Sequence, residues 1–187
     1  MKTTVFFKVP IPAAIKPKIK LLKSVAEETL KSIRNKNFET SIIFVNAAEI
    51  KKINKQFLDK NRLTDVIAFN YPTTRSSALG GLKSKGGANE LIVTPWVAAP
   101  YLGCATSQDS RGVTHEMKFK EPIPFGDVFI CMDQAKKQAA SLNHSLLKEL
   151  AILTVHGCLH LKGMEDGTKS EKAEMDKKTD FYIKKHF

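Results

Sequence analysis

Two histidines and one aspartate in a short C-terminal segment are the residues best suited to chemistry. His156 and His160 are four positions apart, so on a helix they lie on one face, one turn apart, and their imidazoles can converge on one metal ion. Gly163 lets the chain turn back after that helix, which places Asp166 to supply an oxygen ligand. Three protein ligands leave one position for water, as in a catalytic zinc site. The sequence therefore predicts one Zn²⁺ bound by His156, His160 and Asp166.

The alternative is that both histidines are satisfied in a core, with Asp166 in a solvated turn. Gly157 follows His156, so the glutamate of the HExxH motif of zinc peptidases is absent, which argues against peptide hydrolysis by that route. A glycine here instead lets another segment or a substrate approach closely. Cys158 falls on the other side of the helix and is interpreted as a small core residue.

Length and charge limit which classes of protein this chain can belong to. The chain has 187 residues, which suits a single domain with a core of its own. It has no apolar run long enough to predict a membrane span, and three scattered cysteines indicate a reducing compartment. The formal net charge of +11 favours a polyanionic partner, with nucleic acid the first candidate. The alternative is a lysine-rich composition with no specific partner.

The elements that must position the site follow from hydrophobic periodicity and capping residues. Ser145 is expected to cap a nearly all-apolar, buried helix over 146–161, and Thr168 with Glu171 forms a capping box for a last helix. Strands followed by helices through short connections predict an α+β domain, a small mixed sheet packed against helices with a buried metal-binding helix. The other expected elements are strands over 5–10, 41–47, 64–71 and 125–132, and helices over about 15–34, from Asn46 through Phe57, and from Asp133 to about Leu142.

Residues from about 72 to 124 are interpreted as a loop insertion in this domain. The stretch holds five prolines and six glycines and shows too little apolar periodicity to build a core, apart from one expected strand at 90–96. It reads either as a surface loop or as a flap that contacts RNA, the latter supported by its basic residues Arg75, Lys83, Lys85 and Arg111. His115 in this stretch, and His144 and His186 outside it, are interpreted as surface residues.

The motif around the histidines resembles the YbeY family of zinc-dependent endoribonucleases, which mature ribosomal RNA. The family signature is H-G-x-L-H-L-x-G-x-x-H, and HGCLHLKGMED at 156–166 matches it at every fixed position but the last. Two further segments are similar to the family in the right order: Asn54 with Thr64, Asp65, Val66 and Phe69, and the pair Gly126 and Asp127. The resemblance implies a single-strand-specific, zinc-dependent endoribonuclease in ribosomal RNA maturation.

Three departures from the family bear on activity. Asp166 stands where the family has its third histidine, and its negative charge should make a bound water less acidic than three neutral imidazoles would. Leu58 stands where the family usually has an arginine, and the nearby Arg62 is the candidate to replace it as a catalytic residue. Ala68 replaces a serine. Thr64, Asp65 and Asp127 are expected to line the substrate groove or to brace the histidines from a second layer; otherwise they simply bound strands.

The expected partners are a ribosomal RNA precursor and the ribosomal subunit that contains it, with no membrane and no DNA. The expected location is the cytoplasm, or else an organelle of bacterial descent. Two other functions stay open: a non-catalytic RNA-binding factor associated with the ribosome, and a zinc hydrolase of another substrate class. RNA turnover measured over a salt series, together with metal analysis, would separate the three.

Overall fold

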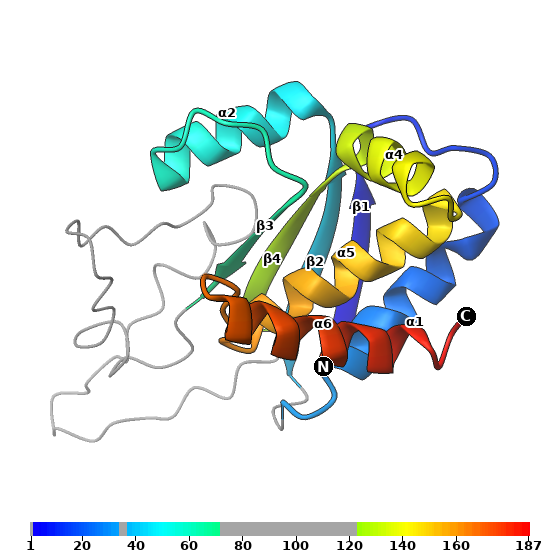
Figure 1. The fold of residues 1–187 in the computed structure, drawn as a ribbon, viewed down its shortest axis with the longest axis vertical. Coiled ribbons are helices and arrows are strands. Elements are labelled where there is room, and N and C mark those ends of the chain that lie inside the picture. The colour runs from blue at the N-terminus through cyan, green and yellow to red at the C-terminus, as the bar shows by residue number, and fades with distance from the viewer. Residues whose placement is uncertain (1, 34–36, 72–122) are drawn as a thin grey trace, which may run out of the picture.

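The sheet has four strands in the order β1-β2-β4-β3 in the computed structural model, which describes residues 2–33, 37–71 and 123–187. The strands are β1 (Lys2–Phe7), β2 (Phe38–Val45), β3 (Val66–Asn70) and β4 (Ile123–Cys131). The first, second and fourth run parallel, whereas β3 runs antiparallel to β4 at the edge (Figure 1). The mixed sheet with its helices confirms the predicted α+β class.

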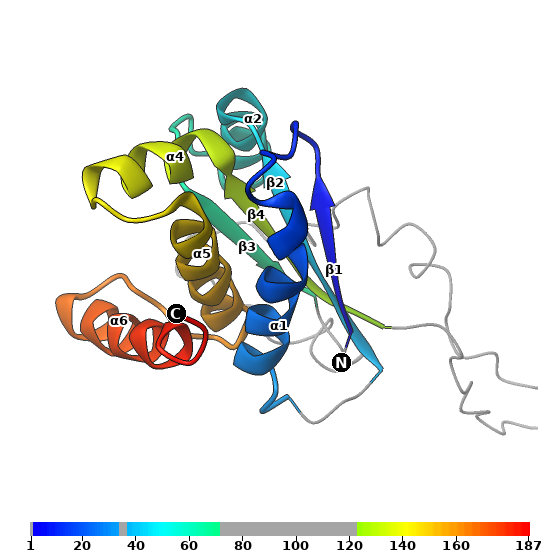
Figure 2. The ribbon, with the colours of Figure 1, turned by 90° about the vertical axis from the view of Figure 1, so that its right-hand side faces the viewer.

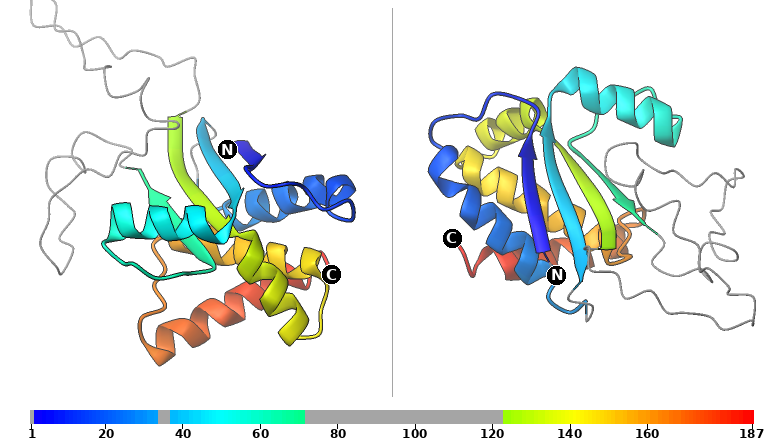
Figure 3. Two further views of the ribbon diagram at one scale, coloured as in Figure 1. Left: turned by 90° about the horizontal axis from the view of Figure 1, so that it is seen from above. Right: turned by 180° about the vertical axis from the view of Figure 1, so that it is seen from behind.

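Helices cover both faces of this sheet (Figure 2 and Figure 3). On one face lie α1 (Ile19–Thr29), α4 (Met132–Ser141) and α5 (Leu146–Leu161), and α6 (Lys169–Ile183) packs on α5 and α1 outside them. On the other face lies α2 (Ala47–Leu58), whose Ile50 joins a smaller apolar cluster with Phe69 and Phe129. The larger core lies between the sheet and α1, α4 and α5, and α5 supplies much of it. None of the helices in the described ranges has the length and apolarity needed to cross a membrane.

Capping residues fix where the helices around the site begin. The Ser145 side chain accepts from the Lys148 N–H at the start of α5, and Thr168 and Glu171 form a reciprocal capping box at the start of α6, both as predicted. Asn46 caps α2 by accepting from the Glu49 N–H. The Glu49 side chain pairs with Lys8 and does not complete a reciprocal capping box.

Two expected helices differ from the structure. The helix predicted over 15–34 is shorter: a 3₁₀ turn at Lys16–Lys18 holds Pro17, and α1 ends at Thr29. Pro17 has no N–H to donate within a continuous α-helix, and beyond the end of α1 the Thr29 carbonyl accepts from Lys162 Nζ at 3.2 Å. Asp133 does not cap α4, which begins after Cys131. Its carboxylate accepts from the Ala47 N–H at 2.8 Å and so caps α2.

Other boundaries shift by a few residues. Strand β1 starts before Val5 and ends before Pro10, and Ile123 and Pro124, expected at the end of the insertion, belong to β4. The strand predicted at 90–96 and the basic residues of the insertion lie outside the described residues.

Candidate metal centre

The candidate centre lies at the C-terminal end of α5, where this buried helix crosses the sheet. His156 and His160 are both half-buried and belong to the last turns of the helix. Cys158, between them in sequence, is fully buried in the core and is not a ligand, as expected from its place on the other side of the helix.

Gly157 sets how closely α5 approaches the sheet. A Cβ at this position would lie 2.3 Å from Val128 Cγ1 of β4 and 3.2 Å from Val66 Cγ2 of β3, so no larger residue fits without a shift. A glycine inside a helix costs roughly 0.5–1 kcal/mol relative to alanine. Close packing of Gly157 on β3 and β4 offsets that cost and holds the helix, and with it His156, against the strands.

A Schellman motif ends α5 and orients the second histidine. Gly163 has φ +83°, the Gly163 N–H donates to the His160 carbonyl, and the Met164 N–H donates to the Leu159 carbonyl. The turn brings the Met164 carbonyl oxygen 2.9 Å from His160 Nδ1. Since a carbonyl only accepts, Nδ1 carries the proton and Nε2 of the neutral ring is left as a ligand atom.

The three predicted ligands meet at one place. Nε2 of His160 lies 3.2 Å from Nε2 of His156, which in turn lies 3.6 Å from Oδ2 of Asp166. One ligand atom from each residue lies within 4.8 Å of the other two. Atoms bound to a tetrahedral zinc at about 2.0–2.1 Å are themselves about 3.3–3.4 Å apart. The group is therefore of the right size and donor set to hold one metal ion, and the side chain of Asp166, 43% exposed, reaches it from the solvent side.

The electrostatics of the site keep His156 neutral. Burial and the adjacent His160 lower the pKa of His156, and the nearby Lys172 also lowers it, whereas Asp166 and Asp65 act in the opposite direction. A neutral imidazole is the form that binds a metal. Lys172 of α6 and Asp65 lie close enough to the site for their charges to act on His156.

Asp65 is held beside the site by three donors. Its carboxylate accepts from the Gln138 side chain at 2.9 Å, from the Val66 N–H at 2.9 Å and from the Thr64 hydroxyl at 3.3 Å. Thr64 thus acts on Asp65, and Asp65 acts on His156 by its charge. Asp65 thus lies near enough to His156 for its charge to act there, and Thr64 donates to Asp65.

Asp127 and Arg62 are placed differently. Gly126 and Val128 of β4 face α5, so the alternation of a strand turns Asp127 to the opposite face, where it accepts from the Tyr71 hydroxyl at 2.7 Å. Asp127 is not brought together with the histidines. Arg62 is exposed, and its carbonyl accepts from the Asn54 side chain at 2.8 Å. Leu58, which occupies the family's arginine position, is also exposed.

Two histidines interpreted as surface residues are partly buried beside glutamates. His144 lies 2.9 Å from Glu149, whose buried carboxyl has a pKa raised by burial. His186 lies 2.8 Å from Glu28, which also binds Lys185. Sequence reasoning also missed Asn70, whose amide donates to the Leu161 carbonyl at the end of α5. His186 and Asn70 lie far in sequence from their partners, and the pair of His144 with Glu149 follows no motif, so only the fold could reveal these contacts.

Comparisons with known proteins show the family of this chain. A family model described as Endoribonuclease YbeY matches residues 12–186. A relative from Elusimicrobium minutum named Endoribonuclease YbeY is 34% identical over 96% of this chain and 95% of its own, and one of the same name from Limosilactobacillus reuteri is 32% identical over 84% and 77%. A solution structure from Thermotoga maritima covers 98% of this chain and 88% of its own with a TM-score of 0.50 and 20% identity, which shows the fold. The chain belongs to the YbeY family of endoribonucleases.

Proposed function

We propose that this protein cleaves single-stranded RNA internally, with one zinc ion held by His156, His160 and Asp166, and that its substrate is a ribosomal RNA precursor. The observation that carries the proposal is the convergence of these three ligand atoms within 4.8 Å in a chain of the YbeY family. The net charge of +11 suits a polyanionic substrate.

Zinc is the metal we infer from the donors. Two imidazole nitrogens and one carboxylate oxygen are a common set for catalytic zinc, and three protein ligands leave room for a further one. When bound, the ion would polarise a phosphoryl oxygen and lower the pKa of a water molecule.

The residues of this chain would prepare the site for that chemistry. The Met164 carbonyl holds the His160 ring in the tautomer that leaves Nε2 bare, and burial keeps His156 neutral. Asp65, held by Gln138 and Thr64, would act on His156 by its charge from outside the ligand set. We propose that Lys172 and Arg62 contact the RNA backbone and stabilise negative charge that develops on the phosphate.

The test is metal analysis together with cleavage of single-stranded RNA. His156→Ala should lose both the metal and the cleavage, whereas His186→Ala, a histidine that pairs with Glu28 away from the site, should keep both. Normal cleavage by His156→Ala without bound metal would refute the proposal.

A non-catalytic RNA-binding factor is the second candidate. The exposed carboxylate of Asp166 at the family's histidine position, and the exposed Leu58 at its arginine position, favour it. That function predicts tight, salt-sensitive RNA binding without turnover. A zinc hydrolase of a small substrate would instead show turnover with little dependence on salt, so one salt series separates the three.

A further inference from the structure

Strand β1 lies at one edge of the sheet and pairs in parallel with β2. Its other side presents a row of backbone N–H and C=O groups. Lys8 donates its N–H inward to the Phe44 carbonyl, whereas the Thr3 N–H points outward and donates to Glu27 Oε1 at 3.3 Å. By alternation, Val5 and Phe7 also direct their N–H and C=O groups outward. No strand of the described residues pairs with this side. An open edge of this kind is a template for an added strand.

The face of β1 that points away from α1 carries an exposed aromatic residue. Phe6 is 48% exposed, and it is the large apolar side chain of β1 that the described part of the fold leaves in solvent. Its neighbours Val5 and Phe7 point to the other face and pack against the core. A strand added beside β1 would cover Phe6 and thus remove apolar surface from water.

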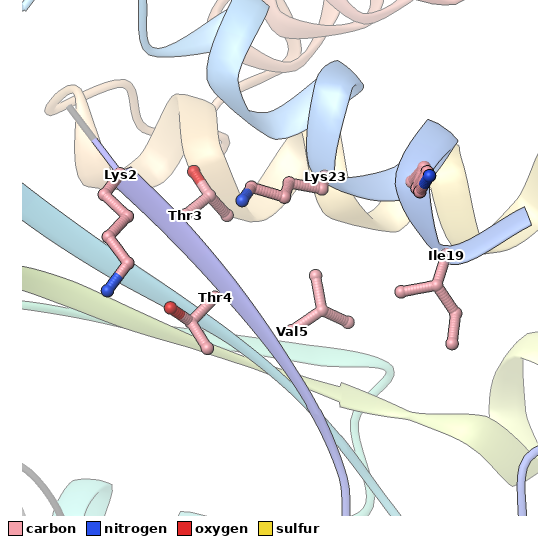
Figure 4. Close-up of a pocket in the computed structure, with 7 residues that line it drawn as sticks. Lys2, Thr3, Thr4, Val5, Ile19 and Lys23 are labelled. Carbon is pink, nitrogen blue, oxygen red and sulfur yellow. The ribbon is translucent and has the colours of Figure 1, made fainter.

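Lysines surround the same edge. Between β1 and α1 lies an open hollow of about 360 Å³, lined by Lys2, Thr3, Thr4, Val5, Ile19, Lys20 and Lys23 (Figure 4). Lys23 extends toward Thr3, 3.8 Å from Glu27, and Lys2 lies 3.3 Å from Glu39. The third cation, Lys20, is exposed and makes no ion pair with another described residue. The Glu27 carboxylate is an example of an acidic group at this edge, since it accepts from the Thr3 N–H and lies beside Lys23.

We propose that the outer edge of β1 binds an extended acidic segment of a partner protein as an additional strand. The backbone of Val5 and Phe7 would pair with it, Phe6 would pack on it, and Lys2, Lys20 and Lys23 would contact its carboxylates. Lys20, which makes no ion pair with another described residue, argues against a second copy of this chain, because each copy would bring the same cation to the interface. Alternating N–H and C=O groups suit a peptide, whereas RNA phosphates would use only the donors.

This surface is separate from the metal centre. Strand β1 occupies one edge of the sheet, and β3, whose start lies against Asp65 and Gly157, occupies the other. The inference therefore does not depend on the proposed nuclease function.

The experiment uses the full chain and a labelled peptide of about seven residues that alternates glutamate with valine. Binding is measured by fluorescence anisotropy, and the contact residues by amide chemical shifts. We expect shifts on Thr3, Val5, Phe6 and Phe7. Val5→Pro, which removes one outward N–H but no ladder bond to β2, should abolish detectable binding. Lys20→Glu with Lys23→Glu should weaken binding about fivefold or more.

The matched control is Lys51→Glu with Lys52→Glu, which reverses two exposed lysines of α2 and should leave the affinity unchanged. Circular dichroism and thermal melting establish that each variant is folded. Unchanged binding by Val5→Pro, or equal weakening by the α2 control, would overturn the proposal. The proposal would also be overturned if sedimentation showed that the wild type is a dimer and Val5→Pro a monomer. The same holds if an oligouridine probe displaced the peptide and bound the Val5→Pro variant equally well.

Discussion

His160 Nδ1 lies 2.9 Å from the carbonyl oxygen of Met164, four residues further along the chain and beyond the end of α5. The residue that makes this contact possible is Gly163, with φ +83°. The helix-ending turn and the second layer of the metal centre are thus one structure. Substitutions in the turn should therefore change the affinity of the site for a metal ion.

Gly163→Ala should weaken metal binding without touching a ligand. An L-residue in this left-handed conformation costs about 1–2 kcal/mol, and the relaxed turn would move the Met164 carbonyl. We expect metal affinity, measured by competition with a chelator, to fall about 10- to 100-fold. Gly167→Ala is the control, since its Cβ would make only an ordinary 3.8 Å contact with Glu171. Equal affinities for the two variants would contradict this coupling.

Asp166 should be required for metal binding, and histidine should replace it. We expect Asp166→Ala to lower the affinity about 100-fold or more, above the scale of outer-layer changes. Asp166→His should retain the metal, because imidazole is also a zinc ligand. Removing the adjacent exposed carboxylate with Glu165→Ala should have little effect in the same titration. A wild-type affinity for Asp166→Ala would exclude Asp166 from the site.

Gly157→Ala should destabilise the protein although alanine is the better helix former by about 1 kcal/mol. The added methyl group would meet Val128 Cγ1 at 2.3 Å, and overpacking of this kind costs about 1–3 kcal/mol. The measurement is the free energy of unfolding in urea. Val128→Ala should recover part of the loss when combined with Gly157→Ala. A variant as stable as wild type would show that α5 can shift away from the strands.

Glu149→Gln should change how stability depends on pH. Burial raises the pKa of Glu149 above its ordinary value of 4.5, so the folded state holds the proton more tightly than the unfolded state. Below about pH 4.5 both states are protonated and the substitution should matter least. As the pH rises further, ionisation favours the unfolded wild type, so the variant should gain relative stability toward neutral pH.

Urea unfolding of the Glu149→Gln variant and wild type at several pH values measures this difference. His144→Ala should have the opposite effect, because it removes the imidazole that lowers the pKa of Glu149. A difference between Glu149→Gln and wild type that is constant with pH would rule out this assignment.

Local signals predicted the local structure well. Apolar periodicity with the caps at Ser145 and Thr168 defined α5 and α6, and the spacing of His156, His160 and Asp166 predicted which side chains meet. These features depend on residues a few positions apart.

Long-range partners were beyond the reach of the same reasoning. Asp133 resembled a cap for the helix that follows it, yet it caps α2, 86 positions away in sequence. The face on which Asp127 lies depends on which residues of β4 contact α5, and that is a property of packing. The partner of His186, Glu28, likewise lies far away in sequence.

The antiparallel pairing of β3 with β4 has a consequence for how this family can vary in length. The Tyr71 N–H donates to the Phe125 carbonyl at 3.0 Å, so the chain leaves and re-enters the sheet at neighbouring points of one hairpin. In general, each doubling of the length of a flexible connection between two fixed points costs only about 0.6 kcal/mol in closure entropy. Members of the family could therefore differ in the number of residues between β3 and β4 while these two strands keep the same register.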